Sequence, residues 1–267
     1  MASNLHDKVI GMAQQLISSP GENSQKLYNM LRLLAKYRSQ LIVNTIVQEH
    51  GFIVQSGPFK GMELYKDVSE GCFAPKLLGC YEQELHHVIN SIVKTGYKNV
   101  VNIGCAEGYY AVGLARLLPK DIKTYAYDIN PEARRICKEV ATINGVENRI
   151  EIAGEFGPED FEAFTEEKSL LICDIEGAEL ELLHPAVTPA LTKVDILVEL
   201  HDVFNSDISK IIMERFKPSH SIEYIEMGNR DINEFPDLHA FEHLDQLLAF
   251  WEWRTGPTPW AYMTVGA

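Results

Sequence analysis

An apolar run that ends in a glycine loop constrains the fold of this chain more than any other feature. The run Val100–Ile103 has the composition of a buried strand, and it leads into a loop that begins with Gly104 and ends with Gly108. A helix-like segment follows, and the next strand-like segment, 122–128, ends at Asp128. A strand, a glycine loop, a helix and a strand ending in a carboxylate form the layout of a nucleotide-binding βαβ unit. The sequence therefore predicts a parallel sheet that binds a ligand at the carboxyl ends of its strands.

The same loop indicates which kind of nucleotide it binds. A dinucleotide fingerprint uses three glycines to seat a pyrophosphate, whereas Ala106 stands here where a middle glycine could be. The neighbouring Glu107 would repel a pyrophosphate by its negative charge. Both features disfavour an NAD(P)-dependent oxidoreductase. A nucleoside cofactor without phosphates fits better, and we expect S-adenosylmethionine.

From about residue 98 onward, strand-like and helix-like segments alternate along the chain. Short buried strands alternating with helices predict a mostly parallel sheet with right-handed crossovers. We expect strands at 98–104, 122–128, 149–153, 168–174, 194–200, 220–227 and 259–265. We expect helices between them at 108–118, 131–144, 157–165, 178–191, 207–216 and 241–253. The predicted fold class is α/β, a doubly wound and mostly parallel seven-stranded Rossmann-like sheet.

The segment before the alternating region predicts a helical extension. Residues 3–18 and 24–49 have the pattern of amphipathic helices, and the turn residues of 51–80 predict a short hairpin and a loop. We therefore divide the chain into an N-terminal helical extension or cap, 1–80, and a cofactor-binding domain, 81–267. The N-terminal helices could cover a substrate or join two copies in a homodimer, and the sequence leaves both open.

Composition and charge exclude several classes of partner. With 267 residues, 46% of them hydrophobic, the chain can bury a substantial core. A net charge of −14 opposes binding to phosphate backbones, so we expect no nucleic-acid partner. The first residues lack the basic and apolar regions of a signal peptide, and no run of about 18 apolar residues predicts a membrane span. The five cysteines form no C-x-x-C pair. Their odd number and their dispersal along the chain favour a reducing compartment, and we expect a cytoplasmic protein without membrane partners.

Three segments resemble the class I S-adenosylmethionine-dependent methyltransferases and, more narrowly, the FkbM-like methyltransferases. They are VNIGCAEG at 101–108, DINP at 128–131 and CDIEGAE at 173–179, and the resemblance covers about residues 80–267. It implies a Rossmann-like methyltransferase fold and methyl transfer to a small molecule, with oxygen as the first choice of acceptor. The chain departs from the family's first motif at Asn102, where an acidic residue is usual, and at Ala106, where glycine is usual.

The expected cofactor site lies on the glycine loop and the neighbouring strand ends. Gly104 and Gly108 would line the methionine and ribose end of the cofactor, unless they only form a tight turn. Asp128 would accept hydrogen bonds from both ribose hydroxyls; its alternative role as a helix N-cap suits Asn130 better. Ile129 would lie against the adenine. The complete predicted set is Asn102, Gly104, Cys105, Gly108, Asp128, Ile129, Glu155 and Asp174.

Ionisable residues also gather at the ends of the fourth and fifth predicted strands. Asp174 ends one strand, while Glu199 and His201 share a face of the next, with Asp202 at its tip. These four side chains could hold a divalent metal such as Mg²⁺ or Mn²⁺. Alternatively, His201 is a general base, with Asp174 and Glu199 beside it at the catalytic centre, or the group is simply a satisfied polar strand end. We interpret Glu179 as a favourable charge at a helix N-terminus.

Two other functions stay open at this point. The acidic cluster could hold a cationic amine or guanidine, which would make the protein an N-methyltransferase that needs no metal. The chain could also be a catalytically silent, methyltransferase-like subunit that binds a partner through residues 1–80.

Overall fold

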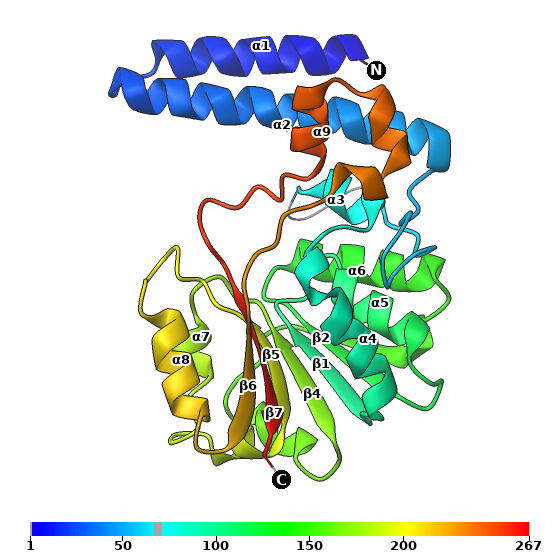
Figure 1. Ribbon diagram of the computed structural model, residues 1–267, viewed down its shortest axis with the longest axis vertical. Coiled ribbons are helices and arrows are strands. Elements are labelled where there is room, and N and C mark those ends of the chain that lie inside the picture. Colours follow the sequence, from blue (N-terminus) through cyan, green and yellow to red (C-terminus); the bar gives the residue numbers. More distant parts are fainter. Residues whose placement is uncertain (1, 67–70, 267) are drawn as a thin grey trace.

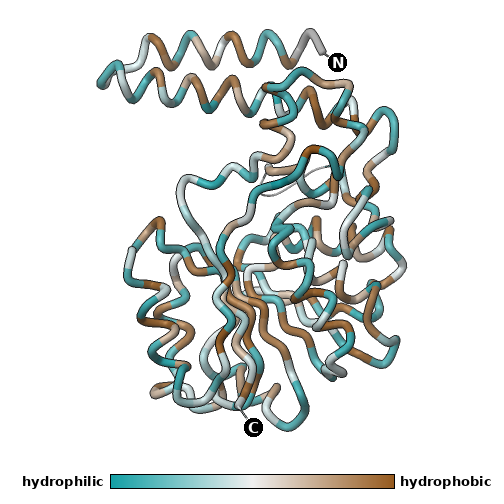
Figure 2. Tube along the Cα trace, viewed as in Figure 1, coloured by the Kyte–Doolittle hydropathy of each residue, from teal (hydrophilic) through white to brown (hydrophobic). Residues whose placement is uncertain are grey.

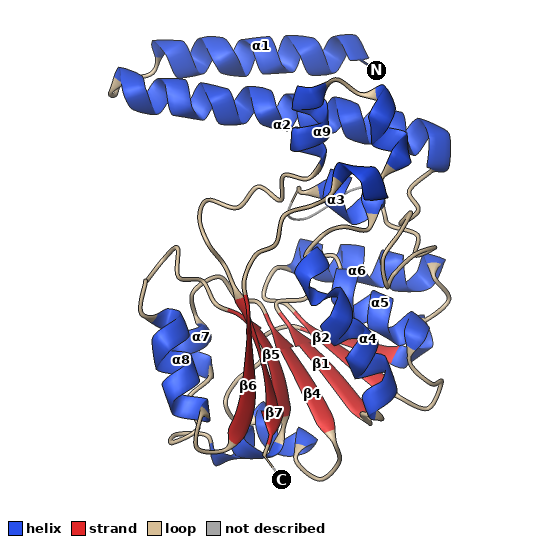
Figure 3. Cartoon of the chain, viewed as in Figure 1, coloured by secondary structure: helices blue, strands red, loops and turns tan. Residues whose placement is uncertain are grey.

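A seven-stranded sheet forms the centre of the protein, with strand order β3-β2-β1-β4-β5-β7-β6 (Figures 1 and 3). This computed structural model describes residues 2–66 and 71–266. Strands β1 to β5 pair in parallel, whereas β7 runs antiparallel to both β5 and β6. The strands are β1 Asn99–Ile103, β2 Lys123–Tyr127, β3 Ile150–Ala153, β4 Ser169–Cys173, β5 Asp195–Glu199, β6 His220–Ile225 and β7 Trp260–Val265. The predicted doubly wound, mostly parallel sheet is confirmed.

The side chains of the central strands alternate between two hydrophobic cores. In β4, Leu170 and Ile172 pack into a core with α4, α5 and α6, whereas Leu171 and Cys173 pack into a core with α8 on the opposite face. Every residue of β4 and β5 is buried, as expected for strands covered by helices on both faces. Figure 2 shows the resulting concentration of hydrophobic residues along the strands.

Nine α-helices are present among the described residues. They are α1 Ala2–Ser18, α2 Asn23–His50, α3 Phe73–Leu78, α4 His86–Thr95, α5 Tyr109–Leu117, α6 Pro131–Ile143, α7 Glu179–Leu182, α8 Ile208–Phe216 and α9 His243–Ala249. No helix in this described part of the chain is long and apolar enough to cross a membrane.

Three of the predicted helices are wrong in extent. The segment 241–253 is helical only over α9, which ends at Ala249. The segment predicted as one helix at 178–191 contains only α7 and a 3-10 helix, Pro189–Lys193. Pro185 and Pro189 explain the break, because proline lacks the amide hydrogen and disfavours helical geometry in the residue before it. The segment 157–165 forms only the 3-10 helix Asp160–Phe164.

Helices α1 and α2 form an antiparallel hairpin that extends beyond the rest of the molecule on one side (Figure 1). The second half of α2 buries Ile42, Val43 and Ile46, and α9 packs against the same helix. A bidentate ion pair between Arg38 and Asp245, with both N–O distances at 2.6 Å, joins the two helices. The last helix of the chain therefore packs with the N-terminal helices, and we call α1, α2 and α9 together the cap.

The hydrophobic core continues across residue 80. Phe59, Met62 and Leu77 are buried in the same core as the residues of α4 and α5. Among the described residues of the predicted extension, α1 and the first half of α2 contribute nothing to this core. The segment after α2 contributes α3 and a single isolated bridge between Ile53 and Glu63, where we had predicted a short hairpin.

Candidate active site

A cavity of about 590 Å³ opens at the carboxyl ends of β1, β2, β3 and β4. It lies where the strand order reverses between β1 and β4, the position at which open α/β sheets bind ligands. We call it the cofactor cavity. Of the predicted cofactor residues, it is lined by Gly104, Asp128, Ile129, Glu155 and Asp174.

The glycine loop brings the ends of β1 and β4 into close approach. Gly104 has φ +76°, and a Cβ atom there would lie 1.7 Å from the carbonyl oxygen of Asp174. Gly108 has φ +88°, and its Cβ would lie 2.7 Å from the sulfur of Cys137. Both positions therefore require glycine. Ala106 adopts a left-handed backbone as well, with φ +46°, and it also lines the cavity.

Asp128 ties the glycine loop to the start of α6. Its Oδ2 accepts a hydrogen bond from the amide of Ala106, and its Oδ1 accepts one from the amide of Asn130, both at 2.8 Å. Asn130 is the N-cap of α6, accepting from the amide of Glu132 at 3.0 Å, so the cap falls where the sequence favoured it. Each carboxylate oxygen of Asp128 has a second lone pair, which leaves capacity for two ligand hydroxyls.

Three of the predicted cofactor residues do not line this cavity. Asn102 is buried within β1. Cys105 is buried beside Cys137, and this contact together with desolvation raises the pKa of its thiol. Gly108 is the N-cap of α5, and a Cβ atom there would point at the sulfur of Cys137 and not into the cavity.

Glu107 also differs from the sequence interpretation. Its carboxylate is buried and forms an ion pair with the buried Lys76 of α3. It does not line the cofactor cavity, so it cannot repel a pyrophosphate there. The use of Glu107 to exclude a dinucleotide was therefore wrong, because the direction of a loop side chain is set by tertiary packing.

A second cavity of about 330 Å³ adjoins the first. Asp174 and Glu176 line both cavities. The second cavity also contains Glu199 and His201 at the end of β5, and aromatic side chains contribute to its walls. These aromatic residues are Tyr81, Phe204 and Trp253. We call it the acceptor cavity.

His201 lies at the centre of three carboxylates. Its Nδ1 lies 2.7 Å from Oε1 of Glu179, and since an ionised carboxylate only accepts, Nδ1 donates this hydrogen bond. Its Nε2 lies 3.3 Å from Oε2 of Glu199 and 3.6 Å from Oδ1 of Asp174. The ring of Phe204 stacks on the imidazole with a centroid distance of 5.6 Å. The fixed Nδ1 hydrogen bond leaves Nε2 facing the acidic groups of the acceptor cavity.

The surroundings of His201 favour its protonated form. Burial by itself lowers the pKa of His201, but the hydrogen bond with Glu179 and the charges of Glu199 and Glu176 outweigh it and raise this pKa. Burial likewise would raise the pKa of Glu199, yet the positive charge of Arg254 brings it below its ordinary value. The strand edge is thus built to hold positive charge.

Asp174, Glu199 and His201 form a group that could hold a metal ion, with one ligand atom of each lying within 4.8 Å of the others. The predicted fourth ligand, Asp202, lies outside this group. Its Oδ2 accepts from the hydroxyl of Ser209 at 2.6 Å and its Oδ1 from the Ser209 amide at 2.9 Å. Asp202 is therefore committed to the start of α8.

Two residues of this site were missed from the sequence. Glu179, interpreted as a favourable charge at a helix start, is fully buried and bonded to His201. Arg254, in the link between α9 and β7, pairs with Glu199. The motif containing Glu179 was visible, but its side-chain direction depends on the left-handed turn at Glu176 and Gly177. For Arg254, the sequence carries no local signal.

A family model described as O-methyltransferase matches residues 77–176. Among curated proteins, a release factor glutamine methyltransferase from Dictyoglomus turgidum is 34% identical over 102 residues, covering 38% of this chain and 34% of that enzyme. A ribosomal protein L11 methyltransferase from Allorhizobium ampelinum is 34% identical over 93 residues, which are 31% of this chain and 30% of that protein. The match thus spans about a third of the length of these relatives.

Two of the solved structures that the chain resembles are named as O-methyltransferases. The O-methyltransferase TomG from Streptomyces achromogenes, in complex with SAM, is 12% identical with a TM-score of 0.48, covering 72% of this chain and 83% of that one. An O-methyltransferase from Bacillus cereus, in complex with SAH, is 11% identical with a TM-score of 0.47, covering 86% and 90%. Likeness at this level does not bear on substrate or activity. The family model matches the part of the chain that contains the glycine loop and β1 to β4, so the similarity to O-methyltransferases lies in the part of the sheet that forms the cofactor cavity.

Proposed function

We propose that this protein transfers a methyl group from S-adenosylmethionine to an oxygen of a small molecule held in the acceptor cavity. One observation carries the proposal: Asp174 and Glu176 line both the cofactor cavity and the acceptor cavity. Ligands in the two cavities would meet at this shared wall, next to His201. Binding that brings the reacting atoms together in line supplies much of the rate enhancement in such a transfer.

The chemistry of the cofactor cavity supports S-adenosylmethionine. Its volume, about 590 Å³, lies in the usual range of small-molecule sites. Asp128 would accept from the ribose hydroxyls, and Ile129, whose side chain is largely exposed, offers an apolar surface to the adenine. Among the described residues that line the cavity there is no Lys or Arg, whereas five are Asp or Glu. Such a lining suits a cationic sulfonium and repels a pyrophosphate.

His201 is the proposed proton acceptor. S-adenosylmethionine, when bound, supplies a methyl group on a positively charged sulfur and so needs little further activation. In its neutral form, His201 would accept the proton of an acceptor hydroxyl at Nε2 while that oxygen takes up the methyl group, and its raised pKa makes the neutral imidazole a stronger base. The hydrogen bond from Nδ1 to Glu179 holds the ring in this tautomer and orientation.

A divalent metal is the second candidate for activating the acceptor. Asp174, Glu199 and His201 offer two carboxylates and an imidazole, a donor set that suits Mg²⁺ or Mn²⁺. The carboxylate of Glu179 on the other imidazole nitrogen is a common arrangement behind metal-binding histidines. A metal in this position would lower the pKa of an acceptor hydroxyl.

The acidic lining also favours cationic acceptors, which keeps N-methylation as a second function. Four carboxylates line the acceptor cavity, those of Asp174, Glu176, Glu199 and Glu252, against the one guanidinium of Arg254. An amine or guanidinium would be attracted by this excess negative charge. Turnover of benzylamine but not of phenol, compared at equal concentration, would favour nitrogen as the acceptor.

The narrower assignments are proposals as well. Membership of the FkbM-like group is supported by the segment 174–179, in which Asp174 and Glu179 both face His201. A cytoplasmic location is supported by the five cysteines, all of which are buried in the fold. The net charge of −14 supports a small-molecule substrate over a nucleic acid.

The decisive experiment is calorimetric titration with S-adenosylmethionine, S-adenosylhomocysteine and NAD, with EDTA or with added Mn²⁺. We expect saturable binding of the adenosyl compounds alone. Binding of NAD alone would contradict the proposal, and loss of methyl transfer in EDTA would select the metal over His201 as the activating group. Cofactor binding without transfer to any small molecule would favour a silent, partner-binding subunit.

The variant His201→Ala tests the catalytic assignment. We expect it to abolish most methyl transfer while S-adenosylmethionine still binds, because His201 does not line the cofactor cavity. Wild-type turnover in His201→Ala would remove this residue from the mechanism.

A further inference from the structure

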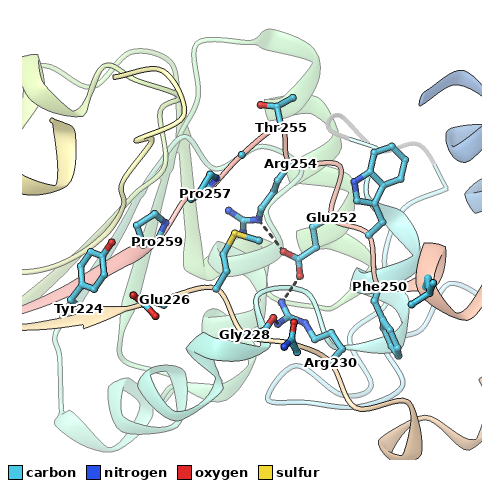
Figure 4. A pocket seen from close by; sticks show the side chains of 15 residues that line it. Tyr224, Glu226, Gly228, Arg230, Phe250, Glu252, Arg254, Thr255, Pro257 and Pro259 are labelled. Atoms are coloured by element: carbon cyan, nitrogen blue, oxygen red, sulfur yellow. Dashed lines mark hydrogen bonds and ion pairs between the residues drawn. The ribbon is translucent and has the colours of Figure 1, made fainter. Parts of the chain in front are cut away.

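The segment 250–259 links α9 in the cap to β7 in the sheet, and we call it the C-terminal strap. It lines the acceptor cavity and also another cavity of about 880 Å³, which Figure 4 shows. Glu252, Arg254 and Thr255 line both of these cavities. Side chains of the strap therefore form part of the wall of both cavities, and they can contact a ligand in the acceptor cavity.

Arg254 binds carboxylates from three separate parts of the chain. Its Nε donates to Glu252 of the strap at 3.0 Å, and its Nη2 donates to Glu82, just before α4, at 2.5 Å. Its Nη1 donates to Glu199 at the end of β5. The side chain of Arg254 is only 12% exposed, and those of Glu82 and Glu199 are 0% and 6% exposed. One guanidinium thus joins the strap, the segment before α4 and the sheet edge.

This arrangement determines how Glu199 faces His201. Oε1 of Glu199 is held by Arg254, while Oε2 lies 3.3 Å from Nε2 of His201. Without Arg254, the buried Glu199 would lose its strongest opposite charge, and its carboxylate would be free to turn fully onto His201. A buried carboxylate that loses its partner is strongly unfavourable, so a rearrangement toward the nearest cation is expected.

The strap itself is anchored at the residue before Arg254. Trp253 has φ +64°, a left-handed conformation that is rare outside glycine and is costly. Its ring lies under Nζ of Lys36 at 4.1 Å, and its carbonyl accepts from Arg32 at 3.3 Å, both from α2. Gly71 leaves room for the ring, because a Cβ there would lie 2.3 Å from it. Contacts with the cap thus hold the strap at Trp253 while Arg254 holds it to the sheet edge.

The bonding of Arg254 also excludes a simpler role. An arginine in a substrate cavity often binds an anionic ligand, yet the guanidinium of Arg254 already contacts three carboxylates. The remaining alternative is that Arg254 has a purely structural role. Its ion pairs would then stabilise the fold without affecting the imidazole of His201 in particular.

We propose that Arg254 is a positioning residue that acts on His201 through Glu199, so that the C-terminal strap completes the acceptor site. The inference rests on the proposed function, since it assumes that His201 works at the reacting atoms. Arg230 provides a matched comparison: it is also a buried arginine bonded to Glu252, at 2.6 Å, and to Glu84, but not to Glu199 (Figure 4).

The test uses nitrogen NMR of the histidine side chains in the whole protein, with the His201 signal assigned by its loss in His201→Gln. In Arg254→Ala we expect the His201 imidazole signals to shift, and guanidinium added at millimolar concentration to restore them. In Arg230→Ala we expect them unchanged, even if thermal stability falls. Unchanged His201 signals in Arg254→Ala, or an equal shift in Arg230→Ala, would overturn the proposal.

A second variant covers the case in which Arg254→Ala does not fold. Arg254→Gln fills most of the space without the charge, and wild-type His201 signals in that variant would also overturn the proposal. Titration of the wild type with S-adenosylmethionine distinguishes a failure of the proposed function from a failure of the proposed role of Arg254. No binding would defeat the proposed function, whereas normal binding together with unresponsive His201 signals would defeat only the role of Arg254.

Discussion

At the scale of single residues, Glu179 shows how much of the site depends on side-chain direction. The residue follows a turn in which Glu176 and Gly177 both have positive φ, and this turn carries the Glu179 carboxylate under His201. It is fully buried, and its Oε2 has no hydrogen-bond partner among the described residues. A buried, incompletely satisfied carboxylate is costly, which indicates that its contact with His201 is functional.

Glu179→Gln should therefore impair catalysis more than cofactor binding. The amide can still accept from Nδ1 but no longer carries a charge, so we expect turnover to fall by about 10- to 100-fold, the usual effect of losing such a supporting carboxylate. Affinity for S-adenosylmethionine, measured by calorimetry, should stay unchanged. The exposed Glu162 on the distal 3-10 helix gives the control Glu162→Gln, and equal turnover in both variants would refute the role of Glu179.

Asp128 makes a separate prediction for the cofactor cavity. Asp128→Ala should weaken binding of S-adenosylmethionine by about 1–3 kcal/mol, the scale for lost hydrogen bonds to a charged group. Part of this loss would come from the glycine loop, since Asp128 also accepts from the amide of Ala106. The Asn side chain in Asp128→Asn keeps one acceptor oxygen. We therefore expect this variant to bind S-adenosylmethionine more tightly than Asp128→Ala does. Calorimetry with the exposed-site control Glu151→Ala would expose any non-specific effect.

At the scale of elements, the contact between β1 and β4 is fixed by Gly104. A Cβ atom at this position would lie 1.7 Å from the backbone oxygen of Asp174, and φ is +76°. Backbone cannot move aside as a flexible side chain can, so Gly104→Ala must shift a strand end. We expect a loss of unfolding free energy of more than about 2 kcal/mol, together with weaker cofactor binding.

Thermal and denaturant unfolding measure this effect. Gly11→Ala is the control, because Gly11 lies inside α1 with open space around its Cα. Alanine there should stabilise the helix by about 0.5–1 kcal/mol. A Gly104→Ala protein as stable as Gly11→Ala would mean that the close approach of β1 and β4 is not required.

The elements also show what sequence patterns can predict. All seven strands were predicted within about two residues of their ends, because buried β-branched runs between turn residues are a local signal. The segment 178–191 was less predictable, since apolar spacing suggested a helix that its prolines prevent. In α2, predicted as an amphipathic helix, Leu27 and Leu31 are exposed, whereas Ile42 in the second half is buried.

At the scale of the whole molecule, contacts between residues far apart in the sequence could be predicted less well than residues at the ends of neighbouring strands. Asp128 and Asp174 could be assigned to the cofactor cavity because strand ends of a parallel sheet meet at one edge. Arg254 could not be assigned, since it reaches Glu82 and Glu199 across 172 and 55 positions of sequence. Contacts of this kind arise from the path of the strap over the folded sheet, which no local period encodes.

The helical hairpin supplies the last prediction, which concerns the assembly. Large apolar side chains are exposed on both of its helices: Ile10, Met12, Ile17, Leu27, Tyr28, Leu31 and Leu34. On α2, Leu27, Leu31 and Leu34 follow the i, i+4, i+7 spacing of a helix-packing seam, and on α1 Ile10 and Ile17 are one heptad apart. The hairpin projects beyond the body of the molecule, which leaves space beside it (Figure 1).

We expect a second copy of the chain to cover this face, with the two hairpins forming a four-helix bundle. Because both helices of one hairpin present apolar residues, a twofold arrangement buries both sets in one closed interface. Leu27→Glu combined with Leu31→Glu should convert a dimer into a monomer in sedimentation or light-scattering measurements, at unchanged affinity for S-adenosylmethionine. The control Lys120→Glu alters charge on a remote exposed loop. A wild-type protein that stays monomeric at high concentration would leave the face to a different partner and refute the dimer.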